Sequence, residues 1–239
     1  MRISAPTSRG AADLFARWPI LKRLKPPGPT LNTGLLLTRV LESYPPNRYR
    51  VLDLGCGSRQ IPGTIRSDIF VSAPGIRADA ARLPFRSQSL DCVLATALLE
   101  HVPNPRVVVR EVYRVLRPTG VFYVEVPFLE GFHADPDDYQ RYTFRGLEVL
   151  LRRFEILDQE VCVGPNSALT WILREYPGAW FSNRWAALAA KFVAAWLTAP
   201  IRHLDRFMAR RPGAYRIAAG LSIVARRPGG RVRESGSAS

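Results

Sequence analysis

Short apolar runs, separated by glycine, proline and acidic residues, alternate with longer amphipathic stretches along this chain. Apolar positions at helical spacing predict helices over 31–44, 105–116 and 143–153. Asn104-Pro105 opens the second helix, Pro118 and Gly120 end it, and Thr143 is a good N-cap for the third. The short runs predict strands near residues 50–54, 64–68, 75–78, 90–96, 120–126, 155–163 and 216–226. This alternation predicts an α/β fold, a Rossmann-like, doubly wound and mostly parallel sheet.

The first strand runs directly into a glycine turn, in the segment Arg50-Val-Leu-Asp-Leu-Gly-Cys-Gly57. Glycine lets a backbone approach a ligand that a side chain would keep away, and open parallel sheets bind ligands beyond the carboxyl ends of their strands. Asp68 and Asp79 follow at the ends of the next two predicted strands. Their carboxylates are placed to accept hydrogen bonds from a ribose and from an adenine amino group. The sequence therefore predicts a nucleoside site at this edge.

Six segments in this order resemble the class I S-adenosylmethionine-dependent methyltransferases, from about residue 50 to residue 163. The chain departs from the common pattern after Gly57, where Ser58-Arg59-Gln60 replaces the usual third glycine. Only ten residues separate Gly57 from Asp68, and Pro62-Gly63 lies among them, so a full crossover helix does not fit. A compact branch of the family has the same shortening. The segments are VLDLGCG (51–57), SDIF (67–70), ADAARLPF (78–85), SLDCVLATALLEHV (89–102), REVYRVLRPTG (110–120) and VFYVEVP (121–127).

The resemblance implies S-adenosyl-L-methionine as the cofactor and a set of residues that bind it. By this resemblance, the first strand and its glycine turn contact the methionine and sulfur side of the cofactor, and the end of the fourth strand lines the sulfur. Asp68, with Ile69 beside it, would bind the ribose, and Asp79, with the backbone of Ala80, would bind the adenine. Arg59 is a further hypothesis, as a contact for the methionine carboxylate. The residues on the methionine and sulfur side are Asp53, Gly55, Cys56, Gly57, Thr96 and Ala97.

Methyl transfer from a sulfonium is an in-line displacement that needs a general base only when the acceptor must lose a proton. The loop at 131–143 follows the fifth strand and is rich in His, Asp, Tyr and Arg, so it is the main candidate for acceptor chemistry. His133 is the preferred base, oriented by Asp135 or Asp138; His101 is a second candidate, which could instead orient its own loop. We expect Arg141 and Tyr142 to anchor the 131–143 loop.

Metal ligation is a weaker hypothesis for this loop. His133, Asp135 and Asp137 do not have a diagnostic ligand spacing, and methyl transfer needs no Lewis acid. We therefore predict no metal.

The predicted core, residues 31–163, follows a basic, proline-rich arm over 1–30. About fifty residues then separate the sixth strand from the seventh, so we infer an inserted helical segment over 164–213, the last core strand at 214–227 and a flexible tail at 228–239. The insertion holds four of the five tryptophans. One face of a helix there carries Trp185, Leu188, Phe192 and Trp196, and the opposite face carries Ala187, Lys191, Ala194 and Thr198. Two interpretations stay open: a lid packed on the body, or a surface that faces a membrane or lipid.

The net charge of +14 lies mostly at the two ends of the chain. Residues 1–30 carry +5 and residues 200–239 carry +7, whereas 31–199 carry only +2. A nucleic-acid enzyme would more often have a basic groove beside its active site, so nucleic acid is the less favoured partner. Peripheral contact with an anionic membrane suits this distribution about as well, and solubilising charge without a partner is a third interpretation.

The three cysteines fit no metal or disulfide spacing, and no apolar stretch resembles a signal peptide or a membrane span. We expect a cytoplasmic protein, with a location at the membrane surface as a further hypothesis. The leading prediction is a methyltransferase acting on a hydroxyl or other nucleophile of a small molecule, sugar or lipid-linked glycan. An RNA methyltransferase and a non-catalytic adaptor of the same fold at a membrane are the alternatives. The sequence does not indicate the oligomeric state.

Overall fold

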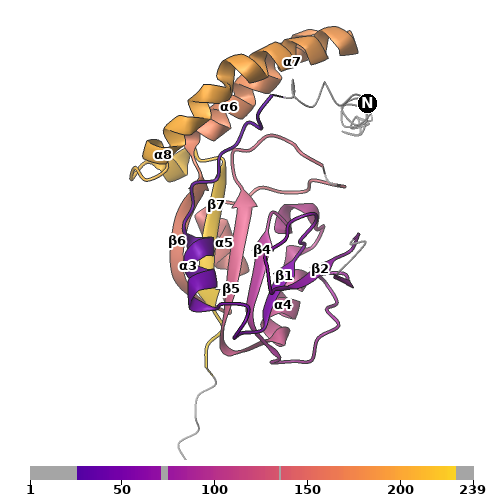
Figure 1. Cartoon of the computed structure of the whole chain (residues 1–239), viewed down its shortest axis with the longest axis vertical. Coiled ribbons are helices and arrows are strands. Elements are labelled where there is room, and N and C mark those ends of the chain that lie inside the picture. Colours follow the sequence, from indigo (N-terminus) through magenta and orange to yellow (C-terminus); the bar gives the residue numbers. More distant parts are fainter. Residues whose placement is uncertain (1–25, 71–74, 135, 230–239) are drawn as a thin grey trace, which may run out of the picture. The chain divides into compact units, whose positions relative to one another are not determined.

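The computed structural model describes residues 26–70, 75–134 and 136–229 (Figure 1). They form a seven-stranded sheet in the order β3-β2-β1-β4-β5-β7-β6. Strands β1 to β5 pair in parallel, so the predicted Rossmann-like, mostly parallel sheet is confirmed. The strands are β1 (Val51–Leu54), β2 (Ile65–Asp68), β3 (Ile76–Arg77), β4 (Leu90–Thr96), β5 (Leu116–Pro127), β6 (Glu155–Val163) and β7 (Gly220–Arg226).

Helices flank these strands and fill the interval between β6 and β7. Before that interval come α3 (Leu36–Ser43), the 3-10 turn η1 (Leu99–His101), α4 (Pro105–Val115) and α5 (Phe144–Leu150). Within it lie α6 (Pro165–Glu175), η2 (Tyr176–Trp180), α7 (Arg184–Thr198), η3 (Ala199–Leu204), α8 (Asp205–Met208) and η4 (Ala214–Arg216). In the described part of the chain, no helix combines the length and apolar character needed to cross a bilayer.

The chain divides into two compact units. The sheet unit comprises the described residues of 35–126, 142–160 and 222–229. The helical unit comprises 26–34, the described residues of 127–141, and 161–221.

Alternating side chains of the central strands build a core on each face of the sheet unit. One face carries Leu52, Leu54 and Phe122, which pack with buried residues of α4 and α5. The other face carries Val51 and Tyr123, which pack with buried residues of α3. Because side chains alternate along a strand, one buried run supplies both cores, as expected for a sheet covered by helices on both faces.

Two predicted boundaries differ from the structure. Helix α4 ends at Val115, one residue before its predicted end, but β5 begins at Leu116 rather than near residue 120, so Pro118 and Gly120 lie within the strand. Residue 90 pairs with 116 but residue 92 pairs with 121, so residues 117–120 form a bulge that accommodates the proline. The helix predicted over 31–44 begins only at Leu36, since Asn32 instead forms a β-bridge to Val163. Thr143 is the N-cap of α5, as predicted.

Candidate functional site

The carboxyl ends of four neighbouring strands lie in register. Leu54 of β1 pairs with Ser67 of β2 and with Ala95 of β4, and Asp68 pairs with Arg77 of β3. The residues that follow these strand ends therefore share one edge of the sheet unit. This edge carries all of the predicted cofactor residues: Asp53, Gly55, Cys56, Gly57, Asp68, Ile69, Asp79, Ala80, Thr96 and Ala97.

The turn after β1 requires its two glycines for different reasons. Gly55 has φ +68°, and a Cβ there would lie 2.7 Å from Leu98 Cδ1, so both conformation and space exclude a side chain. Gly57 has φ +49°, but a Cβ there would meet nothing within 4 Å. The space beside Gly57 is open to a ligand. Residues 55–64 form turns without a helix, as the short connection predicted.

Asp68 closes this turn with its carboxylate. Oδ2 accepts the N–H of Gly57 at 2.9 Å, and Oδ1 accepts the N–H of Phe70 at 2.9 Å. Each carboxylate oxygen can accept a second hydrogen bond, so Asp68 retains the capacity to bind a pair of ribose hydroxyls. Ile69 beside it is an exposed apolar side chain. The arrangement offers a polar and an apolar contact side by side.

Asp79 follows β3 and is exposed, whereas Ala80 beside it is buried in the core. Oδ1 of Asp79 accepts the N–H of Ala81 at 2.8 Å, which fixes the carboxylate at the start of a turn. The segment after it is held by Arg114, which donates to the carbonyl oxygens of Leu83 and Phe85. The loop that carries Asp79 is therefore anchored at its far end.

Asp53 is fully buried in β1 and is paired with Arg59. The guanidinium contacts both carboxylate oxygens, one of them from Nε at 3.3 Å. The Arg59 guanidinium is therefore already paired with Asp53. This ion pair competes with the hypothesis that Arg59 binds the carboxylate of the cofactor. Burial raises the pKa of the neighbouring Cys56 thiol, which thus remains protonated and serves as a small apolar residue.

The end of β4 combines an unsatisfied polar atom with a strained backbone. Thr96 Oγ1 is buried and has no hydrogen-bond partner among the residues that the structure describes. Ala97 follows with φ +51°, a conformation that costs a residue with a Cβ about 1 kcal/mol or more. Such groups persist where a ligand satisfies them. Together with the open glycine turn and the two carboxylates, they form a donor and acceptor set that fits a nucleoside cofactor.

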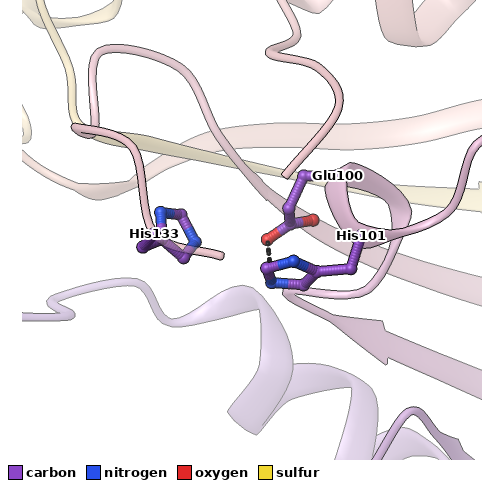
Figure 2. A group of neighbouring side chains, drawn as sticks. All are labelled: Glu100, His101 and His133. Atoms are coloured by element: carbon purple, nitrogen blue, oxygen red, sulfur yellow. Dashed lines mark ion pairs between the residues drawn. The ribbon is translucent and has the colours of Figure 1, made fainter. Parts of the chain in front are cut away.

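Glu100 and His101 lie in η1, just beyond β4 (Figure 2). Glu100 is fully buried, and its Oε1 lies 3.8 Å from Nε2 of His101. The hydroxyl of Tyr142 donates to the carbonyl oxygen of Leu99 at 3.0 Å. Burial, together with the nearby Glu100 carboxylate, raises the pKa of Tyr142, which stays protonated and holds the turn. Tyr142 thus anchors its loop, as predicted.

His133 lies in the loop after β5, and backbone contacts set the orientation of its ring. Nδ1 lies 2.9 Å from the carbonyl oxygen of Gly131. A carbonyl oxygen only accepts, so we assign the proton to Nδ1, which makes Nε2 the basic nitrogen of the neutral ring. The imidazole also packs beside the indole of Trp171, with 5.9 Å between ring centroids. This is the tautomer that a general base acting through Nε2 requires.

Asp138 and Arg141 hold the His133 loop in place. The Asp138 carboxylate accepts the backbone N–H of His133 at 2.9 Å and pairs with Arg141 through both oxygens. Arg141 also donates to the carbonyl oxygens of Glu130 and Gly131 at 3.0 and 2.9 Å, which confirms its predicted anchoring role. Burial raises the pKa of the Asp138 carboxyl, but the hydrogen bonds from Arg141 and His133, with their charges, outweigh it, and the net pKa is lowered.

Asp138 is therefore the residue that the structure places against His133. Asp135, the other candidate for orienting that histidine, lies outside the described residues.

Trp171 is a contact that the sequence analysis missed. A Cβ at Gly131 would lie 1.9 Å from Nε1 of Trp171, so only glycine permits the loop to lie against this indole. The signal was present in Gly131 itself, because an isolated glycine in a functional loop often marks a close approach. Its partner, forty residues later in α6, could not be named from one sequence.

Comparison with known proteins agrees with this geometry. A family model described as a methyltransferase domain matches residues 69–124, from the Asp68 turn to the middle of β5. Two proteins of Arabidopsis thaliana, both named uncharacterized chloroplastic methyltransferases, are similar over part of the chain. One is 39% identical over 93 residues, and the other is 51% identical over 61. These stretches cover 35% and 26% of this chain but only 25% and 17% of the relatives.

Among solved structures, the [4+2]-cyclase SpnF has the same fold, with a TM-score of 0.51 and 19% identity over 95% of this chain and 98% of that one. The ordered motifs, the sheet topology and the matching domain model lead to one conclusion. Residues 69–124 match a methyltransferase domain, and the chain is similar to the class I S-adenosylmethionine-dependent methyltransferases in the order of its motifs and in its sheet topology.

Proposed function

We propose that this protein is an S-adenosylmethionine-dependent methyltransferase that acts on a hydroxyl or other nucleophilic group of a small-molecule, sugar or lipid-linked acceptor. The observation that carries the proposal is the shared edge of β1 to β4, where a tight glycine turn, two fixed carboxylates and an unsatisfied threonine hydroxyl meet. S-adenosylmethionine supplies a methyl group on a sulfonium, which is electrophilic and leaves a neutral thioether behind.

The protein's part in such a transfer is alignment and the exclusion of water. Asp68 would accept the ribose hydroxyls and Asp79 the adenine amino group, while the open face of Gly57 lets the backbone approach the methionine end. Thr96 and Ala97 would line the sulfur side. Each of these groups is held by backbone or core contacts before a ligand arrives, so little ordering is left to binding.

His133 would remove the proton from an acceptor hydroxyl. Its Nδ1 lies 2.9 Å from the Gly131 carbonyl oxygen, and we assign Nε2 as the nitrogen that takes up the proton. Asp138 and Arg141 are positioning residues that hold the loop rather than reacting groups. His101 remains the second candidate, with its Nε2 directed toward the buried Glu100 carboxylate.

Three unbridged, buried cysteines support our proposal that the protein works in the reducing cytoplasm. RNA as an acceptor gains no support from the site, because its fixed polar groups are carboxylates rather than a basic groove.

The first experiment is calorimetric titration of the purified chain with S-adenosylmethionine and S-adenosylhomocysteine. Asp79→Ala removes one charged acceptor, so we expect affinity to fall by about 10-fold or more. Asp158→Asn is the matched control, since Asp158 is an exposed carboxylate on β6. Absence of binding to the well-folded wild-type protein would contradict the proposal.

A second experiment separates catalysis from binding, which matters because a solved structure of this fold is named a cyclase. Wild-type protein is incubated with S-adenosylmethionine and a panel of phenols, hexoses and glycolipids, and S-adenosylhomocysteine is measured. His133→Asn keeps an N–H that can donate to Gly131 but removes the base. We expect unchanged cofactor affinity and turnover reduced by about 100-fold or more. Unchanged turnover would remove His133 from the mechanism.

A further inference from the structure

The helical unit exposes its large apolar side chains and buries its small ones. In α7, Ala194 and Ala195 are buried, whereas Trp185, Phe192 and Trp196 on the other side are exposed. Helix α6 packs beside α7 (Figure 1) and also leaves apolar residues exposed. The aromatic stripe, which the lid interpretation expects to be core, is thus the outer side of its own unit.

The most exposed apolar residues of this unit come from three different elements. Trp180 at the end of η2, Leu197 near the end of α7 and Phe207 in α8 have 73%, 74% and 70% of their surface exposed. Soluble proteins tolerate single residues of this kind, but here each of three consecutive elements exposes a large apolar side chain, in addition to the exposed residues of α6 and α7. We call the exposed apolar residues of 169–208 the apolar surface.

The charges around the apolar surface are nearly all positive. Residues 165–217 hold eight arginines and lysines but only two acidic residues. Glu175 pairs with Lys191, and Asp205 is fully buried, where it accepts the N–H groups of Asn166 and Ser167. Both carboxylates are therefore already paired or hydrogen-bonded to groups of the same unit. Arg206, Arg210 and Arg211 remain exposed on α8 and the turn that follows it.

We propose that the apolar surface and its arginines dock the protein on an anionic lipid bilayer. Exposed tryptophans, phenylalanine and leucine beside unneutralised arginines have the composition of an interfacial membrane contact, in which apolar groups insert and cations meet lipid phosphates. The excess of positive charge over this unit complements the phosphates of an anionic bilayer, and this complementarity selects lipid as the partner. The proposal does not depend on methyl transfer, and its test reads out binding alone.

The test is flotation of the full-length chain with vesicles of phosphatidylcholine, with and without phosphatidylglycerol. Wild-type protein is expected to float with the anionic vesicles. The apolar variant Trp180→Ser/Leu197→Ser/Phe207→Ser and the charge variant Arg206→Gln/Arg210→Gln/Arg211→Gln should each lose about 100-fold in partitioning. Because all six positions are exposed, circular dichroism and thermal unfolding should match the wild type. The matched control is Val149→Ser/Arg145→Gln, which removes an exposed apolar residue and an exposed cation from α5.

Four outcomes would overturn the proposal. Wild-type protein that stays in the soluble fraction has no such surface. Flotation that the apolar variant retains would be carried by charge elsewhere in this basic chain. If the apolar variant leaves flotation unchanged but abolishes self-association in size-exclusion chromatography with light scattering, the surface is a dimer contact. If it leaves flotation unchanged but changes cofactor affinity, the surface is a lid.

Discussion

The sheet unit and the helical unit use apolar residues in opposite ways. In β1, β4 and β5 the large side chains point into one of two cores, and Leu52, Leu94 and Phe122 are fully buried. In α7 the buried residues are Ala194 and Ala195, and the tryptophans Trp185 and Trp196 are exposed. An amphipathic pattern therefore shows that a helix has two faces, but it does not show which face is buried.

The difference follows from the size of the residues on each side of the helix. Helix α7 packs beside α6, and its buried residues are Ala194 and Ala195, which bury little apolar area each. In the sheet unit, bulky residues from both layers fill the core to high density. The helical unit should depend more on hydrogen bonds and on single buried polar groups for its stability. Four predictions test this contrast.

The largest effect is expected from a matched pair of leucines. Leu147 of α5 is fully buried, so Leu147→Ala should lower the free energy of unfolding by about 2–5 kcal/mol. Leu197 of α7 is 74% exposed, and Leu197→Ala should change the free energy of unfolding by less than about 0.5 kcal/mol. Urea denaturation of both variants measures the difference. Equal losses would mean that the outer side of α7 is packed after all.

A buried carboxylate should matter next, in the helical unit. Asp205 accepts the N–H groups of Asn166 and Ser167, both at 2.8 Å, and so caps the start of α6 from a distance in sequence. Asp205→Ala leaves these donors buried without a partner and should cost about 2 kcal/mol. Asp205→Asn keeps one acceptor and should lose less. Hydrogen exchange at residues 166 and 167 reports the effect locally; unchanged protection would argue against the cap.

The glycine turn provides a smaller test in the sheet unit. Gly55→Ala introduces a Cβ at φ +68° and 2.7 Å from Leu98, so we expect a loss of about 1–2 kcal/mol in stability. For Gly57→Ala the only cost in stability is that of the positive φ, because the added Cβ would meet no atom within 4 Å. Its main effect should be weaker binding of S-adenosylmethionine. Thermal unfolding and calorimetry separate the two; equal effects of both variants on both measurements would contradict this division.

Several features of the sheet unit could be predicted from the sequence. Strands β1, β4 and β6 match their predicted ranges within a residue or coincide with them. In β1 and β4 the reason is a short, largely buried apolar run. The order of Gly55, Asp68, Asp79 and Thr96 along the chain indicated a common edge, since parallel strands align their carboxyl ends. Both inferences need only local patterns and the geometry of a sheet.

Long-range pairings could not be predicted in the same way. Nothing local connects Gly131 with Trp171, or Asp205 with the start of α6, because these partners are separated by forty residues. Arg59 is close to Asp53 in sequence, but its ion pair depends on the shape of the turn between them. The sequence also left open which face of α7 is buried, because that depends on the elements packed against the helix. Contacts set by tertiary packing lie beyond a single sequence.

The smallest expected effect concerns Asp138, and it depends on pH. Its side chain is 2% exposed, and burial, which raises its pKa, is outweighed by hydrogen bonds from Arg141 and His133, so the folded-state pKa lies below the unfolded one. The ionised carboxylate therefore contributes stability that is fully present above the unfolded pKa of about 3.9 and is lost as pH falls through the folded pKa. Asp138→Asn should cost about 1 kcal/mol at neutral pH. The gap between variant and wild type should shrink in strong acid, where the wild-type carboxyl is also neutral. Urea denaturation over a pH series checks this, with Asp158→Asn, an exposed carboxylate, as the control. A gap that stays constant with pH would mean that the carboxyl shape, rather than its charge, holds the His133 loop.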